Sequence, residues 1–167
     1  QFPTAKVERL DFDTARTRTA YERIIADFEK GKTQILIGTQ MLSKGLDFGN
    51  VSVVGILSTD SLMNFPDFRA HERAYQLMVQ VSGRAGRRDK RGTVVLQTTQ
   101  PEHPLIRMVQ HFAYKEMVSL QLSERSMFRY PPYYRLIVLI LRSRNAEALQ
   151  EMSALYAEKL RARLGER

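Results

Sequence analysis

The sequence has no cysteine and no tryptophan, and only 3 of its 167 residues are histidines. The lack of cysteine excludes disulfide bonds and cysteine-ligated zinc within the chain and makes a reducing cytoplasm the simplest expected location. The longest apolar run, Leu136–Leu141, is far shorter than the roughly 18 residues of a membrane span, so we expect no membrane association. We expect no signal peptide, and the first residue is glutamine. We therefore interpret the chain as a piece of a longer protein.

What the chain does contain is enough apolar sequence for a core and an excess of positive charge. Hydrophobic residues make up 43% of it, which suits one ordinary domain with part of another. Lysine and arginine number 26 against 18 acidic residues, for a net charge of +8. A basic balance of this size favours a polyanionic partner such as nucleic acid.

Short apolar runs alternate with helical patterns through the first hundred residues. The runs predict an edge strand and three buried strands, at residues 7–12, 34–39, 51–57 and 93–98. A helix is predicted to begin with a Thr19/Glu22 capping box and to stop at Gly31. Its apolar face comprises Tyr21, Ile24, Ile25 and Phe28. This alternation is typical of a parallel α/β sheet flanked by helices.

A second helix is predicted after a loop over residues 58–67, with Asp67 as its cap. Its apolar face comprises Ala74, Tyr75, Met78 and Val79. His71, on another face, has no histidine or carboxylate at metal-ligand spacing, so we expect no metal site in this chain.

The last third of the sequence predicts a connector and an incomplete domain. Pro104 suits the first position of one long helix. The apolar face of that helix comprises Ile106, Val109, Ala113, Met117 and Leu120. The Tyr130–Tyr134 segment is a Pro-rich break; its aromatic and arginine residues fit linker packing better than base stacking. Residues 136–141 predict a strand, and Asn145 should cap a final helix.

That last helix is predicted to turn Leu149, Met152, Tyr156 and Leu160 inward. One strand and one helix cannot close a core of their own. We therefore expect three parts: an α/β domain over residues 1–100, a linking helix and break over 101–130, and an incomplete α+β domain over 131–167.

The tripeptide Gly31-Lys32-Thr33 only superficially resembles the end of a phosphate-binding P-loop. The first glycine of that motif would fall on Ala26, and the tripeptide follows a helix and precedes a strand, the reverse of a P-loop. The chain contains neither a Walker A sequence nor an Asp-Glu-x-His sequence.

Residues 80–87, Gln-Val-Ser-Gly-Arg-Ala-Gly-Arg, form the strongest candidate site. Arg84 and Arg87 each follow a glycine. The planar guanidinium group matches phosphate oxygens, and glycine permits tight turns and close approach of a ligand. The alternative is a solvated basic turn. The string resembles motif VI of superfamily 2 helicases, in which arginines of the second RecA-like lobe reach the nucleotide phosphates.

A second polar string, residues 38–48, follows the strand predicted at 34–39. Ligands of open α/β sheets gather at the carboxyl ends of strands. Thr39 could donate to a phosphate, Lys44 supplies a mobile positive charge, and Asp47 could accept from a ribose hydroxyl or orient an arginine. A polar connecting loop is the alternative. The string resembles helicase motif V.

Two further strings narrow the resemblance. They are Phe-Pro-Asp-Phe-Arg-Ala-His-Glu-Arg at residues 65–73 and Gln-Thr-Thr-Gln-Pro-Glu-His-Pro at residues 97–104. Together with the motif V and VI strings, they make nearly the whole chain similar to the PriA family (primosomal protein N′) of bacterial replication-restart helicases. The resemblance implies an α/β fold, the second RecA-like helicase lobe.

The resemblance also implies roles for single residues. Arg84 and Arg87 match the phosphate-facing arginines, with Arg87 as arginine finger, and Gln80 matches the glutamine that couples nucleotide to lobe. Gly45 and Asp47 match positions near the ATP cleft. Thr39, with Gln40 and Lys44, matches the segment expected at the DNA backbone.

For the whole protein the resemblance implies an ATP-dependent 3′–5′ DNA helicase that acts on stalled forks and D-loops. Its ATP and Mg²⁺ would be bound mainly by a first lobe that this chain lacks, and its zinc by cysteines that are also absent. Single-stranded-DNA-binding protein and other primosome proteins would be its partners, in the bacterial cytoplasm at the nucleoid. The alternative is a non-catalytic DNA- or protein-docking module that keeps the motifs as scaffold.

Overall fold

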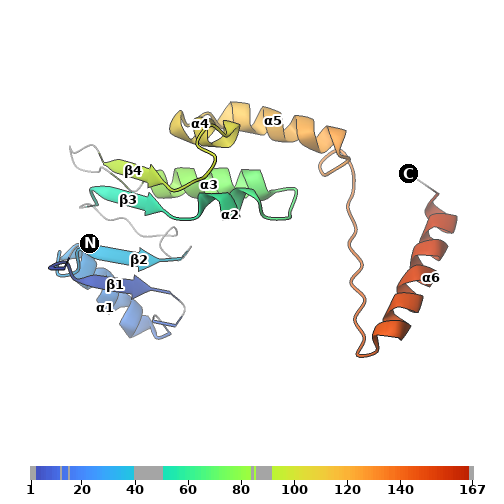
Figure 1. Ribbon diagram of the computed structural model, residues 1–167, viewed down its shortest axis with the longest axis horizontal. Coiled ribbons are helices and arrows are strands. Elements are labelled where there is room, and N and C mark those ends of the chain that lie inside the picture. The colour runs from blue at the N-terminus through green and yellow to red at the C-terminus, as the bar shows by residue number, and fades with distance from the viewer. Residues whose placement is uncertain are drawn as a thin grey trace. The chain divides into compact units, whose positions relative to one another are not determined.

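The structure is a computed structural model that describes residues 3–11, 13–14, 16–39, 51–83, 85 and 92–165 (Figure 1). The chain divides into two compact units, Gln1–Phe128 and Arg129–Arg167. Helices and parallel strand pairs alternate through the first unit, which confirms the predicted α/β class.

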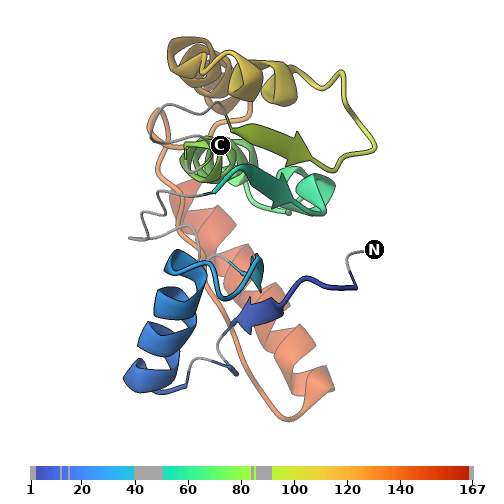
Figure 2. The ribbon, with the colours of Figure 1, turned by 90° about the vertical axis from the view of Figure 1, so that its left-hand side faces the viewer.

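The first part of unit 1 is a β-α-β arrangement (Figure 2). Strands β1 (Val7–Leu10) and β2 (Ile35–Gly38) pair in parallel, with Val7 opposite Ile35 and Leu10 opposite Gly38. Helix α1 (Arg18–Glu29) connects the two strands. Its predicted apolar face is confirmed, because Ile24 and Leu10 form a buried pair. The side chains around that pair are Tyr21, Ile25, Phe28, Leu36 and Val51.

Helix α1 begins at a different residue from the one predicted. Thr17, not Thr19, is the N-cap, and its side chain accepts a hydrogen bond from the Ala20 amide at 3.2 Å. Glu22 accepts from the Arg18 side chain rather than closing a capping box. The stop at Gly31 is confirmed, since the helix ends at Glu29 and Gly31 has φ +72°, a left-handed conformation that favours glycine.

The tripeptide that resembles a P-loop has structural contacts instead. The Thr33 hydroxyl is buried and donates to the Glu8 carboxylate at 2.7 Å. This hydrogen bond lowers the pKa of Glu8 below its usual range. Lys32 pairs with Asp27 of α1 at 3.5 Å.

The second parallel pair is β3 (Val53–Ile56) with β4 (Thr93–Leu96). Two helices lie between these strands in sequence, α2 (Thr59–Met63) and α3 (Ala70–Ser82). The prediction of a loop over residues 58–67 was therefore wrong in part. Thr59 and Met63 are buried, and this tertiary packing stabilises a turn of helix that the polar sequence alone does not indicate.

Not all predicted strands are as buried as their apolar sequences indicated. All four predicted strands are present, but Ile37, Val53 and Val95 are each at least half exposed. Along β1, β3 and β4, exposed side chains alternate with partly or fully buried ones, so the less exposed side chains of each strand lie on one face.

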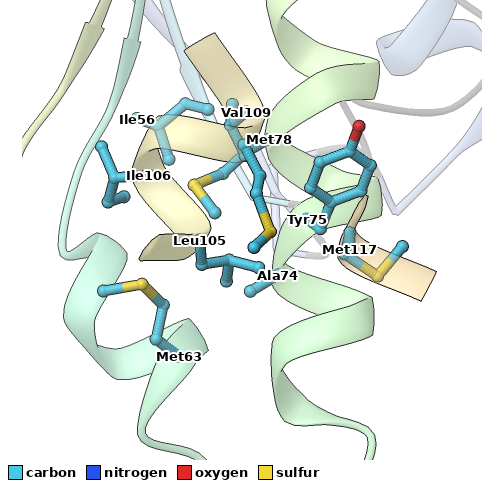
Figure 3. Close-up of a cluster of buried hydrophobic side chains, with 10 residues drawn as sticks. Ile56, Met63, Ala74, Tyr75, Met78, Leu105, Ile106, Val109 and Met117 are labelled. Atoms are coloured by element: carbon cyan, nitrogen blue, oxygen red, sulfur yellow. The ribbon is translucent and has the colours of Figure 1, made fainter. Parts of the chain in front are cut away.

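The main core lies between α3, α2, α4 and α5 (Figure 3). The predicted inner face of α3 is confirmed, because Ala74, Tyr75 and Met78 are buried and Val79 packs against them. The other buried members of the cluster are Ile56, Met63, Leu105, Ile106, Met108, Val109 and Met117.

The connector after β4 is two helices, not the one long helix predicted. Helix α4 (Pro104–Gln110) has Pro104 in its first turn, as predicted, and the His103 side chain accepts from the Leu105 amide at 3.2 Å. Helix α5 (Tyr114–Met127) follows after a break at Phe112, which has φ +51°. On α5, Gln121 is buried, and Leu120 is 38% exposed.

The second unit contains helix α6 (Ala146–Leu164) and extended chain before it. Asn145 caps α6 as predicted, accepting from the Glu147 and Ala148 amides. The predicted strand over residues 136–141 is not formed, because no neighbouring strand pairs with it in the described chain. The predicted inward face of α6 is also wrong, since none of its side chains is buried. In the described part of the chain, no helix is long and apolar enough to span a membrane.

Candidate functional site

Helix α3 leads directly into the basic string at residues 80–87. Gln80 lies in its last turn and is exposed. Gly83 ends the helix by donating to the Val79 carbonyl at 3.0 Å, and the Ala85 amide donates to the Ser82 carbonyl at 3.2 Å. Arg84 and Arg87 lie outside the described residues. The first residues of the string, 80–82, therefore belong to a helix that is anchored in the core.

Gly83 does not need glycine's freedom for its own conformation. Its φ of −65° is right-handed. A Cβ built there would lie 3.6 Å from the nearest carbonyl oxygens, which is an ordinary contact. The chain does turn here, through the Ser82–Ala85 hydrogen bond, but the turn does not require a left-handed backbone at Gly83.

Thr39 is the described member of the motif V-like string. It follows the carboxyl end of β2 and is exposed. Gln40, Lys44, Gly45 and Asp47 lie outside the described residues.

The two described candidate residues occupy different places in unit 1. Thr39 follows a strand of the first pair, whereas Gln80 is on the helix whose chain leads back to the start of β4.

The segment 65–73 is held together at the start of α3 by Asp67. Its carboxylate accepts from the Arg69 amide at 2.8 Å, from the Arg69 side chain at 3.2 Å and from the Arg73 side chain at 2.9 Å. The hydrogen bond from the Arg69 side chain, followed by the one from its amide, lowers the pKa of Asp67 to about 2. The formal N-cap is Arg69, so Asp67 fixes the turn before the helix instead of capping it directly.

Aromatic and charged side chains then join α3 to α5. The guanidinium carbons of Arg69 and Arg125 each lie 5.1 Å from the centre of the Phe68 ring. Arg125 also donates to the Glu72 carboxylate at 2.5 Å. Sequence reasoning noticed the string at 65–73 but missed Arg125, because a lone arginine in a helix carries no signal of its partner.

Two histidines from distant strings also meet. The rings of His71 and His103 are 5.4 Å apart, edge to face. Burial, followed by the charge of His71, lowers the pKa of His103 below its usual range. No group of three metal-ligating side chains gathers among the described residues, so the pair alone does not form a metal site.

The string at residues 97–104 fixes the carboxyl ends of β3 and β4. Asp60 of α2 accepts from the Thr98 hydroxyl and, at 2.8 Å, from the Thr99 amide. These bonds lower the pKa of Asp60. Gln97 accepts from the Ser58 amide at 3.2 Å. The carboxylates of Asp60 and Asp67 are thus both used within the fold, and neither is arranged to hold a metal ion.

Residues 4–89 match the family described as helicase conserved C-terminal domain. The chain is also similar to three proteins named replication restart protein PriA. It is 43% identical to that of Synechocystis sp. over 139 residues, 83% of this chain and 17% of that protein. It is 44% identical to that of Bacillus subtilis over 137 residues, 82% and 17% of the two chains. It is 45% identical to that of Haemophilus influenzae over 132 residues, 79% and 18%.

The match covers only a small part of each relative. The chain spans about a sixth of the length of the Synechocystis and Bacillus proteins. The similarity extends beyond the family match at residue 89, since it covers four-fifths of this chain.

Proposed function

Since the chain belongs to the helicase conserved C-terminal domain family, we propose that it is the second motor lobe of an ATP-driven DNA helicase that acts in replication restart. The observation that carries the proposal is α3, which is anchored in the core and leads straight into the paired-arginine string. A pure scaffold has no need of two glycine-flanked arginines at that point. The printed names of the relatives support the role in replication restart.

In this proposal, the basic string completes an ATP site whose other half lies on a first lobe. Negative charge spreads over the γ-phosphoryl oxygens during transfer, and an arginine supplied from a second element stabilises it, an effect worth roughly 10³–10⁵ in rate. Arg87 is the proposed finger, Arg84 a second phosphate contact, and Gln80 the coupling residue. Gly45 and Asp47 would face the same cleft.

The DNA contacts would come from the motif V-like segment. Thr39 would donate to a phosphate of one strand, with Gln40 and Lys44 beside it. Because these residues belong to the same lobe as Arg87, closure of the lobes on ATP would move them relative to the DNA strand. Reopening after hydrolysis would then place their contacts further along the strand, with 3′–5′ polarity as in the family that the sequence resembles.

Nucleotide and metal binding would rest mainly on the first lobe. ATP would be the substrate and Mg²⁺ would be held there, as the resemblance implies. The carboxylates of Asp60 and Asp67 in this chain are engaged in internal hydrogen bonds. The 167-residue chain alone should therefore not hydrolyse ATP. Forks, D-loops and single strands are the proposed DNA partners, with single-stranded-DNA-binding protein and primosome proteins, in the cytoplasm at the nucleoid.

The alternative, a non-catalytic docking module, is favoured by one observation. The second unit exposes Leu136–Leu141 and buries no side chain of α6. A surface of that kind suits contact with another polypeptide. It does not explain the basic string, so the motor lobe remains the main proposal.

The test is DNA-stimulated ATP hydrolysis by the longer protein that we propose contains this chain, with Arg87→Ala and with Arg18→Ala as control. Arg18 is exposed on α1 and pairs with Glu22. We expect Arg87→Ala to lower the turnover rate by roughly 10³-fold or more while ATP still binds, and Arg18→Ala to change neither. Unchanged turnover in Arg87→Ala would overturn the motor role and leave the docking module.

A further inference from the structure

Helix α3 contacts α5 at its first turn and leads into the basic string at its last turn. Its thirteen residues at about 1.5 Å per residue make a rod of roughly 20 Å. Glu72 lies in its first turn and Gln80 in its last. The helix is continuous and its inner face is buried. The contacts that hold its first turn therefore also help to fix the position of its last turn.

The first turn of α3 is held against α5 by a partly buried ion pair, in which the Glu72 side chain is 35% exposed. Glu72 and Arg125 are 53 positions apart in the chain, and their Oε2 and Nη2 atoms are 2.5 Å apart. The Arg125 side chain is only 15% exposed, and its guanidinium group also faces the Phe68 ring. For comparison, Arg107 on α4 pairs with Glu102 while 62% exposed. A pair shielded from water resists separation more strongly than a surface pair.

Arg125 also lies at the junction between the two units. It belongs to the last turn of α5, which ends at Met127. The second unit begins at Arg129. Along the chain, three residues separate Arg125 from the second unit.

The contact leaves one donor unused. Among the described residues, Nε of Arg125 is buried and has no hydrogen-bond partner. A buried donor without a partner costs free energy, so the position of Arg125 depends on its other contacts, with Glu72 and with the Phe68 ring.

We propose that Glu72 and Arg125 are positioning residues that set α3, and with it the basic string, relative to α5, and so support ATP turnover. This inference rests on the motor role proposed above. The pair touches neither nucleotide nor DNA in this role. It acts by fixing where Gln80 and the residues after it are presented.

The test uses the same longer protein with Arg125→Met, Glu72→Gln and the exchanged pair Glu72→Arg with Arg125→Glu. Networks of this kind change coupling by roughly 2- to 30-fold. We expect either single change to lower DNA-stimulated kcat within that range and leave the KM for ATP unchanged. The exchanged pair should recover at least half of the loss, because it restores the ion pair with its charges reversed. Arg107→Met is the matched control, since it removes an exposed arginine from a similar pair.

The outcomes separate this inference from the proposed function. If Arg87→Ala abolishes turnover but Arg125→Met and Glu72→Gln leave kcat unchanged, the pair has no positioning role and the motor role stands. If Arg87→Ala has no effect, the motor role itself fails. If Arg125→Met does not fold, Glu72→Gln, which preserves side-chain size, decides the question. A loss of kcat that the exchanged pair does not recover also overturns the inference.

Discussion

At the scale of the residue, Asp67 shows how one carboxylate organises a turn. Its carboxylate accepts hydrogen bonds from the Arg69 side chain, the Arg69 amide and the Arg73 side chain. The bonds from Arg69 contribute most to lowering its pKa to about 2, below the usual 3.8. A lowered pKa means that the folded chain binds this proton less readily than the unfolded chain. The contribution to stability is therefore present above about pH 4 and is lost as the pH falls from there towards about pH 2.

We expect Asp67→Asn to reduce the loss of stability at acid pH. The free energy of unfolding is measured by urea unfolding at pH 7, pH 4 and pH 3. Between pH 4 and pH 3 it should fall more for the wild-type chain than for the variant. Asp13→Asn, which removes an exposed carboxylate paired with Arg16, is the control and should follow the wild type. Parallel profiles for wild type and Asp67→Asn would contradict this role of Asp67.

Also at this scale, the sequence singled out candidate residues but could not predict the contacts between side chains. It singled out Gln80 and Thr39, and the structure places both on exposed positions at the ends of regular elements. The partnership of Glu72 with Arg125 was out of reach, because nothing in a single sequence pairs two side chains 53 positions apart. The same holds for His71 and His103.

At the scale of the element, the start of α1 separates two threonines that the sequence could not tell apart. Both precede a plausible first turn, but only Thr17 accepts from a backbone amide of that turn. We expect Thr17→Ala to lower the free energy of unfolding by about 1 kcal/mol, the usual cost of losing a cap. Thr19→Ala should leave it unchanged or raise it slightly, since alanine is the better residue inside a helix.

Thermal or urea unfolding of the two variants and the wild type measures this difference. If Thr19→Ala were the more damaging of the two, the helix would begin where its sequence suggested. The capping box of Thr19 and Glu22 would then replace the cap at Thr17.

Element boundaries depended on tertiary packing that local patterns do not contain. The periodic apolar residues after Pro104 predicted one helix, yet Phe112 takes a left-handed conformation and divides it into α4 and α5. Phenylalanine gives no hint of such a conformation, which is uncommon for a bulky side chain. The division lets Leu105, Met108 and Met117 enter one core.

At the scale of the whole molecule, the two units differ in how much they bury. Unit 1 contains both hydrophobic clusters, whereas α6 in unit 2 buries none of its side chains. The predicted strand at 136–141 does not form, although the segment is apolar as a strand would require. A strand needs a neighbouring strand for its backbone hydrogen bonds, and none pairs with it among the described residues.

We expect a shortened chain of residues 1–128 to unfold at the same temperature as the full chain, within about 2 °C, because a segment without buried side chains adds little stability. Differential scanning calorimetry of the two chains measures this. A shorter chain ending at residue 110, which removes α5 and the buried Met117, is the control and should unfold at a clearly lower temperature. If residues 1–128 unfold much earlier than the full chain, unit 2 contributes to the core.

The packing of α3 against the main core should also slow the hydrogen exchange of its backbone amides. Its amides belong to a helix whose inner side chains, Ala74, Tyr75 and Met78, are in the main core. Such amides exchange with solvent only when the surrounding unit opens, whereas those of α6 need only the fraying of one helix. The backbone of Gln80 should therefore exchange on the slow time scale of unit 1, although its side chain faces solvent. An exposed side chain on a slowly exchanging backbone is what a site needs if it must meet a ligand repeatedly in the same place.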